Sequence, residues 1–185
     1  MRKILSTGLM VATAGFLASC GDSPEEKAAK EAALKVCPPA KVLTDISSYS
    51  TEMPDASLAQ TEWLAANGKM AGVKTTASGL QYKVNQSGNK KAPMPLPTQT
   101  VRVHYHGLFR DGSSFDSSYD RKEDIEFPLN GVIKGWTEGV GLMRPCDAWT
   151  LYIPYELAYG AAGRPPGIPP KSPLVFHVQL IEVSD

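Results

Sequence analysis

The side chains best able to do chemistry in this sequence are aromatic rings accompanied by one carboxylate. Trp136 lies in the segment VIKGWTEGV, which we interpret as a short helix, and Asp116 directly follows Phe115. A large aromatic residue on a short helix is expected to be buried under a sheet, where it either fills the core or floors a pocket. Taken singly, each ring is typical of a packed core. Whether the rings fill a core or line a pocket therefore depends on the rest of the chain.

Other kinds of catalytic site find no support in the sequence. It has no GxSxG motif, phosphate-binding loop or HExxH motif. His104 and His106 share one face of a predicted strand, and His177 could lie nearby, but no third ligand has a readable metal-site spacing. We therefore expect no metal and no cofactor. The 19 basic and 19 acidic residues balance and the basic ones are scattered, which argues against nucleic-acid binding.

The N-terminus has the anatomy of a secretory signal peptide. Arg2 and Lys3 precede a mostly apolar run over residues 4–17, which is too short for a comfortable membrane span. The run ends in Leu-Ala-Ser-Cys, which resembles a bacterial lipobox with cleavage before Cys20. We predict residues 1–19 as the signal peptide and Cys20 as the lipidated residue; the alternative is an ordinary secreted protein. Several acyl chains would anchor the chain stably to the cell envelope. Gly21 after the cysteine favours the outer membrane, facing the periplasm.

The two other cysteines, Cys37 and Cys146, are even in number in a chain predicted to be exported. We hypothesise that they form a disulfide that joins an N-terminal arm to the main domain. Such a bond would close a loop of roughly 100 residues and stabilise the fold by about 4–5 kcal/mol, often less in practice. The alternative is two separate thiols.

The N-terminal part of the mature chain, residues 20–74, reads as a tether and a helical arm. Residues 21–36 predict a solvated helix, because Ser23, Pro24 and Glu26 form a capping signature and the apolar face is thin. A second helix is predicted from near Asp55 or Ser57 to residue 67, ended by a glycine.

The remaining residues predict an α+β domain. Alternating or apolar segments predict strands at 80–84, 101–109, 123–129, 148–153 and 174–183, with the Trp136 helix between the third and the fourth. This order is typical of an antiparallel sheet with one helix packed on it. The loop at 154–173 is rich in proline and glycine and is long enough to indicate a functional role.

Three separated segments then resemble one family. The segments VHYHGLFRDGSSFDSS, VIKGWTEGV and LAYGAAGRPPGIPPKSPLVF occur in the order found in FKBP-type peptidyl-prolyl cis-trans isomerases. The resemblance covers about residues 75–185 and implies an FKBP-type antiparallel sheet wrapped around the short helix. The lead-in GVKTTASGLQYKV resembles the exported macrophage infectivity potentiator branch. Members of that branch carry a longer helical dimerisation region, so the oligomeric state here stays open.

The resemblance also implies the site residues. The positions that match the family's pocket or pocket wall are Tyr105, Phe115, Asp116, Phe127, Val132, Ile133, Trp136, Tyr159, Ile168 and Phe176. Trp136 would be the floor under a prolyl ring, and Tyr105, Phe115 and Phe176 would be walls. Ile133 would offer its backbone N–H, Tyr159 its hydroxyl and Asp116 a hydrogen bond near the reacting amide. Three positions depart from the family's pattern, namely Ile125, Leu157 and Arg164, and these bear on peptide preference.

The activity implied is isomerisation of X–Pro bonds in exported proteins, with proline-containing polypeptides as partners and rapamycin-like macrolides as inhibitors. Rotation about the X–Pro amide makes or breaks no covalent bond, so neither a nucleophile nor a metal is required. The alternative is a proline-segment-binding chaperone or scaffold with little turnover, for which the changed rim at Ile125 and Leu157 is the best argument.

Overall fold

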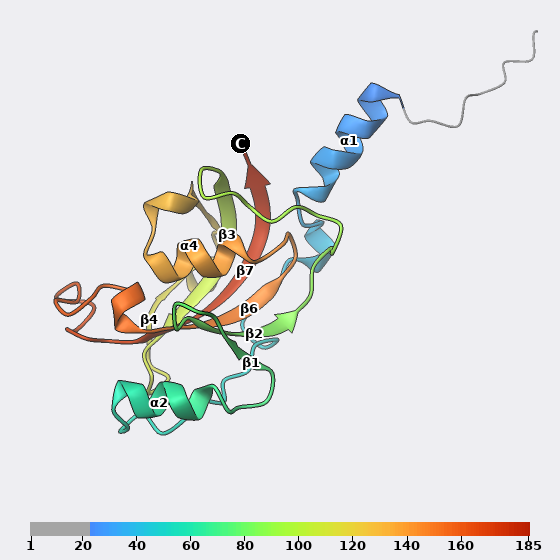
Figure 1. Cartoon of the computed structure of the whole chain (residues 1–185). Helices are drawn as coiled ribbons and strands as arrows, with labels where there is room; N and C mark the ends of the chain where they lie inside the picture. Colours follow the sequence, from blue (N-terminus) through green and yellow to red (C-terminus); the bar gives the residue numbers. More distant parts are fainter. Residues whose placement is uncertain (1–22) are drawn as a thin grey trace, which may run out of the picture.

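The structure is a computed structural model, and it describes residues 23–185. The predicted signal peptide and Cys20 lie outside the described residues. In Figure 1 a curved sheet forms the body of the molecule, α4 lies across one of its faces, and α1 projects from the body. The α+β architecture expected from the sequence is confirmed.

The sheet is antiparallel throughout and has seven strands. Its hydrogen-bonded order is β1-β2-β6-β7-β3-β4, and β5 also pairs with β3. The strands are β1 (Val73–Thr75), β2 (Gln81–Gln86), β3 (Thr100–Leu108), β4 (Ser114–Ser117), β5 (Ile125–Pro128), β6 (Ala148–Ile153) and β7 (Leu174–Ser184). The long central strands β3 and β7 alternate side chains between the two faces, so consecutive residues serve different layers.

Four α-helices and three short 3-10 helices accompany the sheet in the described residues. They are α1 (Pro24–Leu34), η1 (Pro39–Lys41), α2 (Gln60–Asn67), α3 (Ser118–Arg121), η2 (Leu129–Gly131), α4 (Lys134–Gly141) and η3 (Tyr155–Leu157). Among these helices, none is long and apolar enough to cross a membrane.

Helix α4 can lie close to the sheet because it presents glycines to β6. A Cβ atom added at Gly135 would collide with the side chain of Ile153, and one at Gly139 would come within 2.8 Å of Leu151. With no side chain at these positions, the helix packs directly on the strand, and Trp136 and Val140 enter the main core.

The segment from residue 36 to residue 57 covers the opposite face of the sheet. Cys37 donates a backbone hydrogen bond to Ile181 on β7, and Leu43 donates one to the side chain of Gln179. Farther along, Tyr49 stacks on His177 with ring centroids 4.6 Å apart. Because this segment buries outward-facing residues of β7, the sheet has a packed layer on both faces.

Cys37 and Cys146 are joined by a disulfide in the structure, with their Cα atoms 4.9 Å apart. Both residues are buried in a small cluster with Ile181 and the partly buried Val42. The bond therefore ties the start of the covering segment to the turn before β6.

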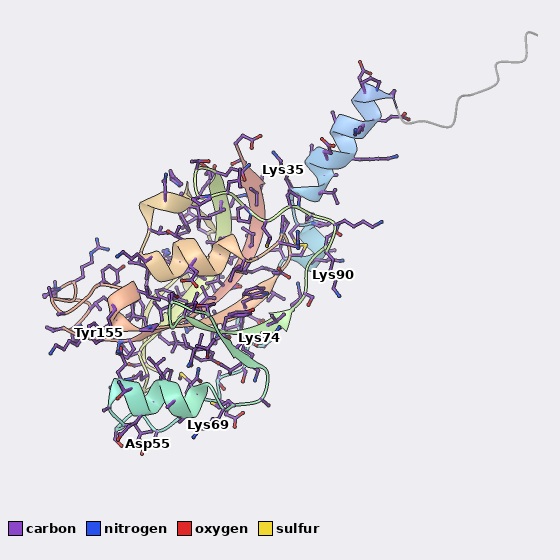
Figure 2. All side chains as sticks on the ribbon, in the orientation of Figure 1. Lys35, Asp55, Lys69, Lys74, Lys90 and Tyr155 are labelled. Carbon is purple, nitrogen blue, oxygen red and sulfur yellow. A yellow bond between two sulfur atoms is a disulfide. The ribbon has the colours of Figure 1, made fainter. Side chains whose placement is uncertain are left out.

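Helix α1 has the predicted capping box. The Ser23 hydroxyl accepts a hydrogen bond from the N–H of Glu26, and the Glu26 carboxylate accepts one from the N–H of Ser23. No residue of α1 is buried, and its side chains project into solvent (Figure 2). The predicted solvated helix is therefore confirmed, although it ends at Leu34 and not at residue 36.

The second predicted helix begins later than the sequence indicates. The expected start near Asp55 or Ser57 is wrong, because α2 begins at Gln60. The Asp55 carboxylate instead accepts the N–H of Ser57 in a local turn, a bond that competes with helix formation. Trp63 on α2 is buried in a cluster separate from the main core, where it packs against Tyr152 on the outer face of β6.

Candidate active site

A cavity of about 430 Å³ opens between α4, the central strands and the long loop that follows β6. Its lining residues come from six stretches of the chain: Tyr105, Phe115, Asp116, Ile125, Phe127, Gly131, Val132, Ile133, Trp136, Tyr159, Arg164 and Phe176. Nine of the ten site residues expected from the resemblance thus lie together. The tenth, Ile168, is buried in the main core and does not line the cavity.

Aromatic rings stand edge-on around Trp136, which is 4% exposed and forms the base of the cavity. The ring of Phe176 lies 5.2 Å from that of Trp136 at an interplanar angle of 89°, and the ring of Tyr105 lies 5.5 Å away at 82°. On another side, Phe127 approaches Trp136 at 5.5 Å and 61°. Edge-to-face packing of this kind fixes each ring against its neighbour, so the apolar cavity is preformed.

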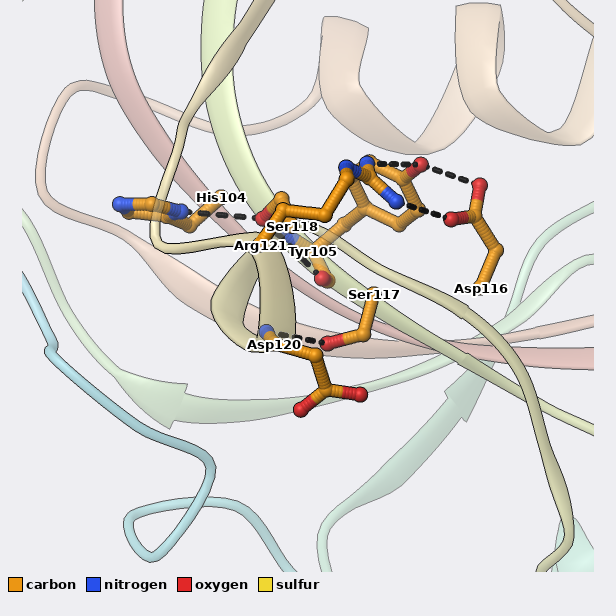
Figure 3. Close-up of polar contacts among 7 residues, drawn as sticks. All are labelled: His104, Tyr105, Asp116, Ser117, Ser118, Asp120 and Arg121. Atoms are coloured by element: carbon orange, nitrogen blue, oxygen red, sulfur yellow. Dashed lines mark hydrogen bonds and ion pairs between the residues drawn. The ribbon is translucent and has the colours of Figure 1, made fainter.

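Three polar side chains contact one another at the edge of this aromatic cavity. The Asp116 carboxylate accepts a hydrogen bond from the Tyr105 hydroxyl on one oxygen and binds the guanidinium of Arg121 with the other (Figure 3). Arg121 also donates to the Tyr105 hydroxyl oxygen at 2.9 Å. The three side chains therefore form a closed ring of polar contacts beside the aromatic floor.

These contacts keep Asp116 ionised. Burial alone would raise the pKa of its carboxyl, but the hydrogen bonds from Tyr105 and Arg121 outweigh burial and hold the pKa below its ordinary value. Burial, reinforced by the bond to Asp116, raises the pKa of the Tyr105 hydroxyl. At neutral pH the pair is thus a carboxylate and a neutral phenol, and Asp116 can accept hydrogen bonds but cannot donate a proton.

Two serines at the end of β4 place this polar group. Ser117 caps α3 by accepting the N–H of Asp120, which starts the single turn that carries Arg121 back toward the cavity. The Ser118 hydroxyl accepts the N–H of Tyr105 at 2.8 Å and also contacts Nδ1 of His104 at 2.9 Å. Both contacts appear in Figure 3 and tie α3 to β3. Side chain and backbone of Tyr105 are therefore both fixed from the same short helix.

Ile133 lies at the N-cap of α4, at the edge of the cavity. Its carbonyl accepts the first bonds of the helix, from the N–H groups of Trp136 at 2.9 Å and Thr137 at 3.1 Å. The backbone of Ile133 is thereby held against the same helix that supplies the floor.

The loop after β6 closes the remaining side. Tyr159 and Arg164 line the cavity, and the Arg164 guanidinium stands over the Tyr159 ring, 5.9 Å from its centroid. Arg164 and Ile168 exchange two backbone hydrogen bonds of 2.8 and 3.0 Å. Since Ile168 is only 6% exposed, it anchors the loop in the core instead of forming a wall.

The three departures from the family's pattern have different places in the structure. Ile125 and Arg164 line the cavity, whereas Leu157 packs against the main core and does not line it. The changed rim is therefore formed by Ile125 and Arg164.

Arg121, which contacts Asp116 and Tyr105 at the edge of the cavity, is not among the residues predicted from the sequence. A signal for it exists, because a serine N-cap, an acid in the first turn and a base in the last turn predict a short helix after Phe115. The sequence does not indicate that Arg121 lies near the cavity, because this depends on how α3 folds back toward Tyr105. Within residues 23–185 no group of three or more His, Cys, Asp or Glu side chains is arranged to bind a metal ion.

Two family models match the chain. The model for FKBP-type peptidyl-prolyl cis-trans isomerase matches residues 91–181, and the model for the domain amino-terminal to this isomerase matches residues 14–84. Together they extend on both sides of the proline-rich stretch before β3.

Individual proteins agree with these matches. The chain is 49% identical over 122 residues to the FKBP-type 22 kDa peptidyl-prolyl cis-trans isomerase of Escherichia coli strain K12, covering 66% of this chain and 58% of that protein. It is 46% identical over 121 residues to the peptidyl-prolyl cis-trans isomerase Mip of Coxiella burnetii, covering 65% and 52%. The chain thus spans little more than half the length of these curated relatives.

One solved structure matches this chain over its own full length. The crystal structure of a peptidyl-prolyl cis-trans isomerase from Pseudomonas syringae pv. tomato superposes with a TM-score of 0.64 at 36% sequence identity, over 74% of this chain and 100% of that chain. Sequence identity at this level, together with the shared fold, indicates common descent rather than likeness of architecture alone. The chain therefore belongs to the family of FKBP-type peptidyl-prolyl cis-trans isomerases.

Proposed function

We propose that this protein catalyses the cis-trans isomerisation of X–Pro peptide bonds in the cavity floored by Trp136. The proposal rests on the aromatic rings that pack edge-on around Trp136. They line a cavity that is open on one side and bordered by an ionised carboxylate. A prolyl ring is a compact apolar group that suits such a floor. The substrates are proline-containing segments of unfolded or folding polypeptides.

The physical chemistry of the reaction fits a dry aromatic site. Rotation about an X–Pro bond faces a barrier of about 20 kcal/mol, because resonance across the amide is lost in the twisted state. The twisted amide is less polar than the planar one, so transfer from water into an apolar cavity favours it. Binding the twisted state more tightly than the planar state lowers the barrier without any covalent step.

Each cavity group has a role in this scheme. Trp136 holds the prolyl ring, and the rings of Tyr105, Phe115 and Phe176 keep water from the amide; Phe127 and Val132 complete the apolar lining. The backbone N–H of Ile133 and the hydroxyl of Tyr159 donate hydrogen bonds to substrate carbonyl groups. Asp116, ionised and held by Tyr105 and Arg121, provides a fixed hydrogen-bond acceptor beside the reacting amide. Ile168 acts indirectly, through the loop that it anchors.

The direct test is an isomerisation assay on the soluble chain from residue 21, with an unstructured X–Pro peptide and without a coupling protease. We expect turnover that rapamycin abolishes. Trp136→Leu should lower kcat/KM by at least about tenfold, which corresponds to about 1.4 kcal/mol of lost transition-state stabilisation. Trp63→Phe is a matched control, since Trp63 is equally buried but belongs to a separate cluster on the other face of the sheet.

A comparison of two tyrosine hydroxyl groups tests whether turnover takes place in this cavity. Tyr159→Phe removes one oxygen atom from the cavity lining and should lower kcat, whereas Tyr155→Phe removes a hydroxyl outside the cavity and should not. Rapamycin binding without turnover in the wild-type chain would move the function to proline-segment binding as a chaperone or scaffold. Turnover that persists unchanged in both Trp136→Leu and Asp116→Ala would reject the site.

We further propose that the mature chain is anchored by lipid at Cys20 in the outer membrane of a bacterial envelope and faces the periplasm. On this proposal residues 1–19 are removed, residues 20–74 form the arm, and residues 75–185 form the isomerase domain. An exported location accords with a disulfide, because oxidising compartments allow such bonds to persist. Labelling with radioactive palmitate should mark the wild-type chain and not Cys20→Ser; labelling of both would reject acylation at this residue.

A further inference from the structure

The cavity lining contains two charged side chains, Asp116 and Arg164. Asp116 is engaged by Arg121, so this pair adds no net charge to the site. Arg164 differs, because within residues 23–185 its guanidinium makes no hydrogen bond or ion pair. The guanidinium instead lies over the face of the Tyr159 ring. The mouth of the cavity thus carries one uncompensated positive charge.

Both the backbone and the side chain of Arg164 are held in position. The backbone of Arg164 is fixed by its two hydrogen bonds to Ile168, whose side chain is buried in the core. The side chain lies over Tyr159, itself a lining residue. A cation over an aromatic face is attracted by the ring's quadrupole, which narrows the range of positions that the guanidinium samples. Arg164 is therefore aimed at the cavity mouth, although the side chain is exposed.

Gly163 supports the same geometry. Its φ angle is +69°, and a Cβ atom there would come within 2.5 Å of the carbonyl oxygens of Ile168 and Pro169. The chain can make this tight return only with glycine at this position. The loop that presents Arg164 is thus closed on itself and not an extended flap.

We propose that Arg164 is a specificity-determining residue, which selects X–Pro segments that carry an aspartate or glutamate next to the prolyl bond. A guanidinium offers a planar fork of donors that matches a carboxylate, and this one has all of its hydrogen-bond donors available. Trp136, Tyr159 and Arg164 line the same cavity, so a proline on Trp136 brings its neighbouring residues to the cavity that Arg164 borders. The inference rests on the proposed isomerase function and names its preferred substrate class.

The test uses one peptide sequence with Glu, Gln or Lys placed in turn at X, at the residue before X and at the residue after proline. At one or more of these positions we expect kcat/KM to fall in the order Glu, Gln, Lys, with about two- to fivefold between Glu and Gln, as for an ion pair at a partly exposed rim. The preference should shrink as salt rises to about 0.5 M, because exposed charges are screened.

Two variants identify the residue responsible. Arg164→Ala should abolish the preference for Glu over Lys, and Arg164→Glu should reverse it. Lys171→Glu is the matched control: it makes the same change of charge in the same loop, at an exposed residue that does not line the cavity. The control should keep both the activity and the preference of the wild type.

The outcomes separate this inference from the proposed function. Turnover of the neutral peptide without any effect of peptide charge, or a charge preference that survives in Arg164→Ala, would overturn the role of Arg164 and leave the isomerase intact. If no peptide is turned over, the same nine peptides can be titrated against the intrinsic tryptophan fluorescence of the chain. Equal affinity for the Glu and Lys peptides would then overturn the inference on binding alone.

Discussion

Arg121 and Asp116 form an ion pair at the edge of the cavity, and the Tyr105 hydroxyl occupies the second oxygen of the same carboxylate. The pair brings together a strand residue and a residue of the following one-turn helix, so its geometry depends on the cap at Ser117. Both charged side chains are 44% exposed, which means that the pair does little for stability. The ion pair instead acts on Asp116, because it keeps the carboxylate charged and fixes its orientation.

Removing Arg121 should therefore move the pH dependence of activity. Burial raises the pKa of Asp116 and the two donors lower it, so Arg121→Ala should raise this pKa from its present low value. The wild type should keep the ionised carboxylate to lower pH than the variant, and the acid limb of kcat/KM should shift upward in Arg121→Ala. We also expect about a tenfold lower kcat/KM at pH 7.

A neighbouring cation provides the control for this experiment. Lys122 is one residue away and does not line the cavity, and its φ of 55° is a conformation that asparagine tolerates. Lys122→Asn should leave the pH profile unchanged. An identical acid limb in the wild type and Arg121→Ala would contradict the role assigned to the ion pair.

Gly107 permits the close approach of two cavity walls. A Cβ atom at this position would lie 2.7 Å from Phe115 and 3.0 Å from Phe176. Gly107→Ala should therefore push both rings from their edge-on packing, raise KM for an X–Pro peptide several-fold and weaken macrolide binding, at a cost in stability of about 1–3 kcal/mol. Gly141→Ala meets nothing within 4 Å and should behave as wild type. Unchanged peptide binding in Gly107→Ala would show that the walls can move apart freely.

The disulfide closes a loop of 109 residues in sequence separation. Its removal in the double variant Cys37→Ser, Cys146→Ser should lower the free energy of unfolding by up to about 4–5 kcal/mol, because the unfolded chain gains conformational freedom. No cavity-lining residue belongs to the disulfide cluster, so the folded variant should retain its X–Pro turnover. Urea unfolding measures the first quantity and the isomerisation assay the second. Two titratable thiols in folded wild-type protein, prepared without reductant, would show that the bond is absent.

Stability should fall in acid because of His177. Burial, together with the facing His106, lowers the pKa of His177 to about 4, whereas its ordinary value is near 6.5. Between these values the unfolded chain binds the proton and the folded chain does not, so stability rises with pH across this window and is lost as pH falls through it. From this residue we expect a loss of about 3 kcal/mol between pH 7 and pH 4.

The variant His177→Gln isolates this contribution. The neutral glutamine can still reach Thr150, which now bonds Nδ1 of His177 at 2.9 Å. The variant should be less stable than wild type at pH 7, and its free energy of unfolding should change less between pH 7 and pH 5. Burial also lowers the pKa of His104, so some acid sensitivity should remain in the variant. Equal slopes in the two proteins would assign the acid sensitivity to other groups.

Local signals in the sequence were sufficient for several elements. Alternation predicted β6 with its observed bounds, and the capping box at Ser23 predicted the start of α1, because both depend on residues a few positions apart. The three family motifs also gathered eight cavity residues that no periodicity would have brought together, and Phe127 lies between two of the motifs. In contrast, the short strands β1 and β4 had no clear pattern of their own and exist because longer strands pair with them.

Only the tertiary structure decided how distant parts of the chain meet. It placed Arg121 on Asp116, set Ile168 in the core behind the loop and left Arg164 without a charged partner at the cavity mouth. It also laid the segment after α1 over the outer face of β7, where Tyr49 covers His177. The sequence alone determined the family and the antiparallel sheet, since these follow from residue type and order, and the resemblance predicted which aromatic residues gather around Trp136. Burial, ion pairing and shifted pKa values depend on which side chains become neighbours in space, and that is settled by strand pairing and packing.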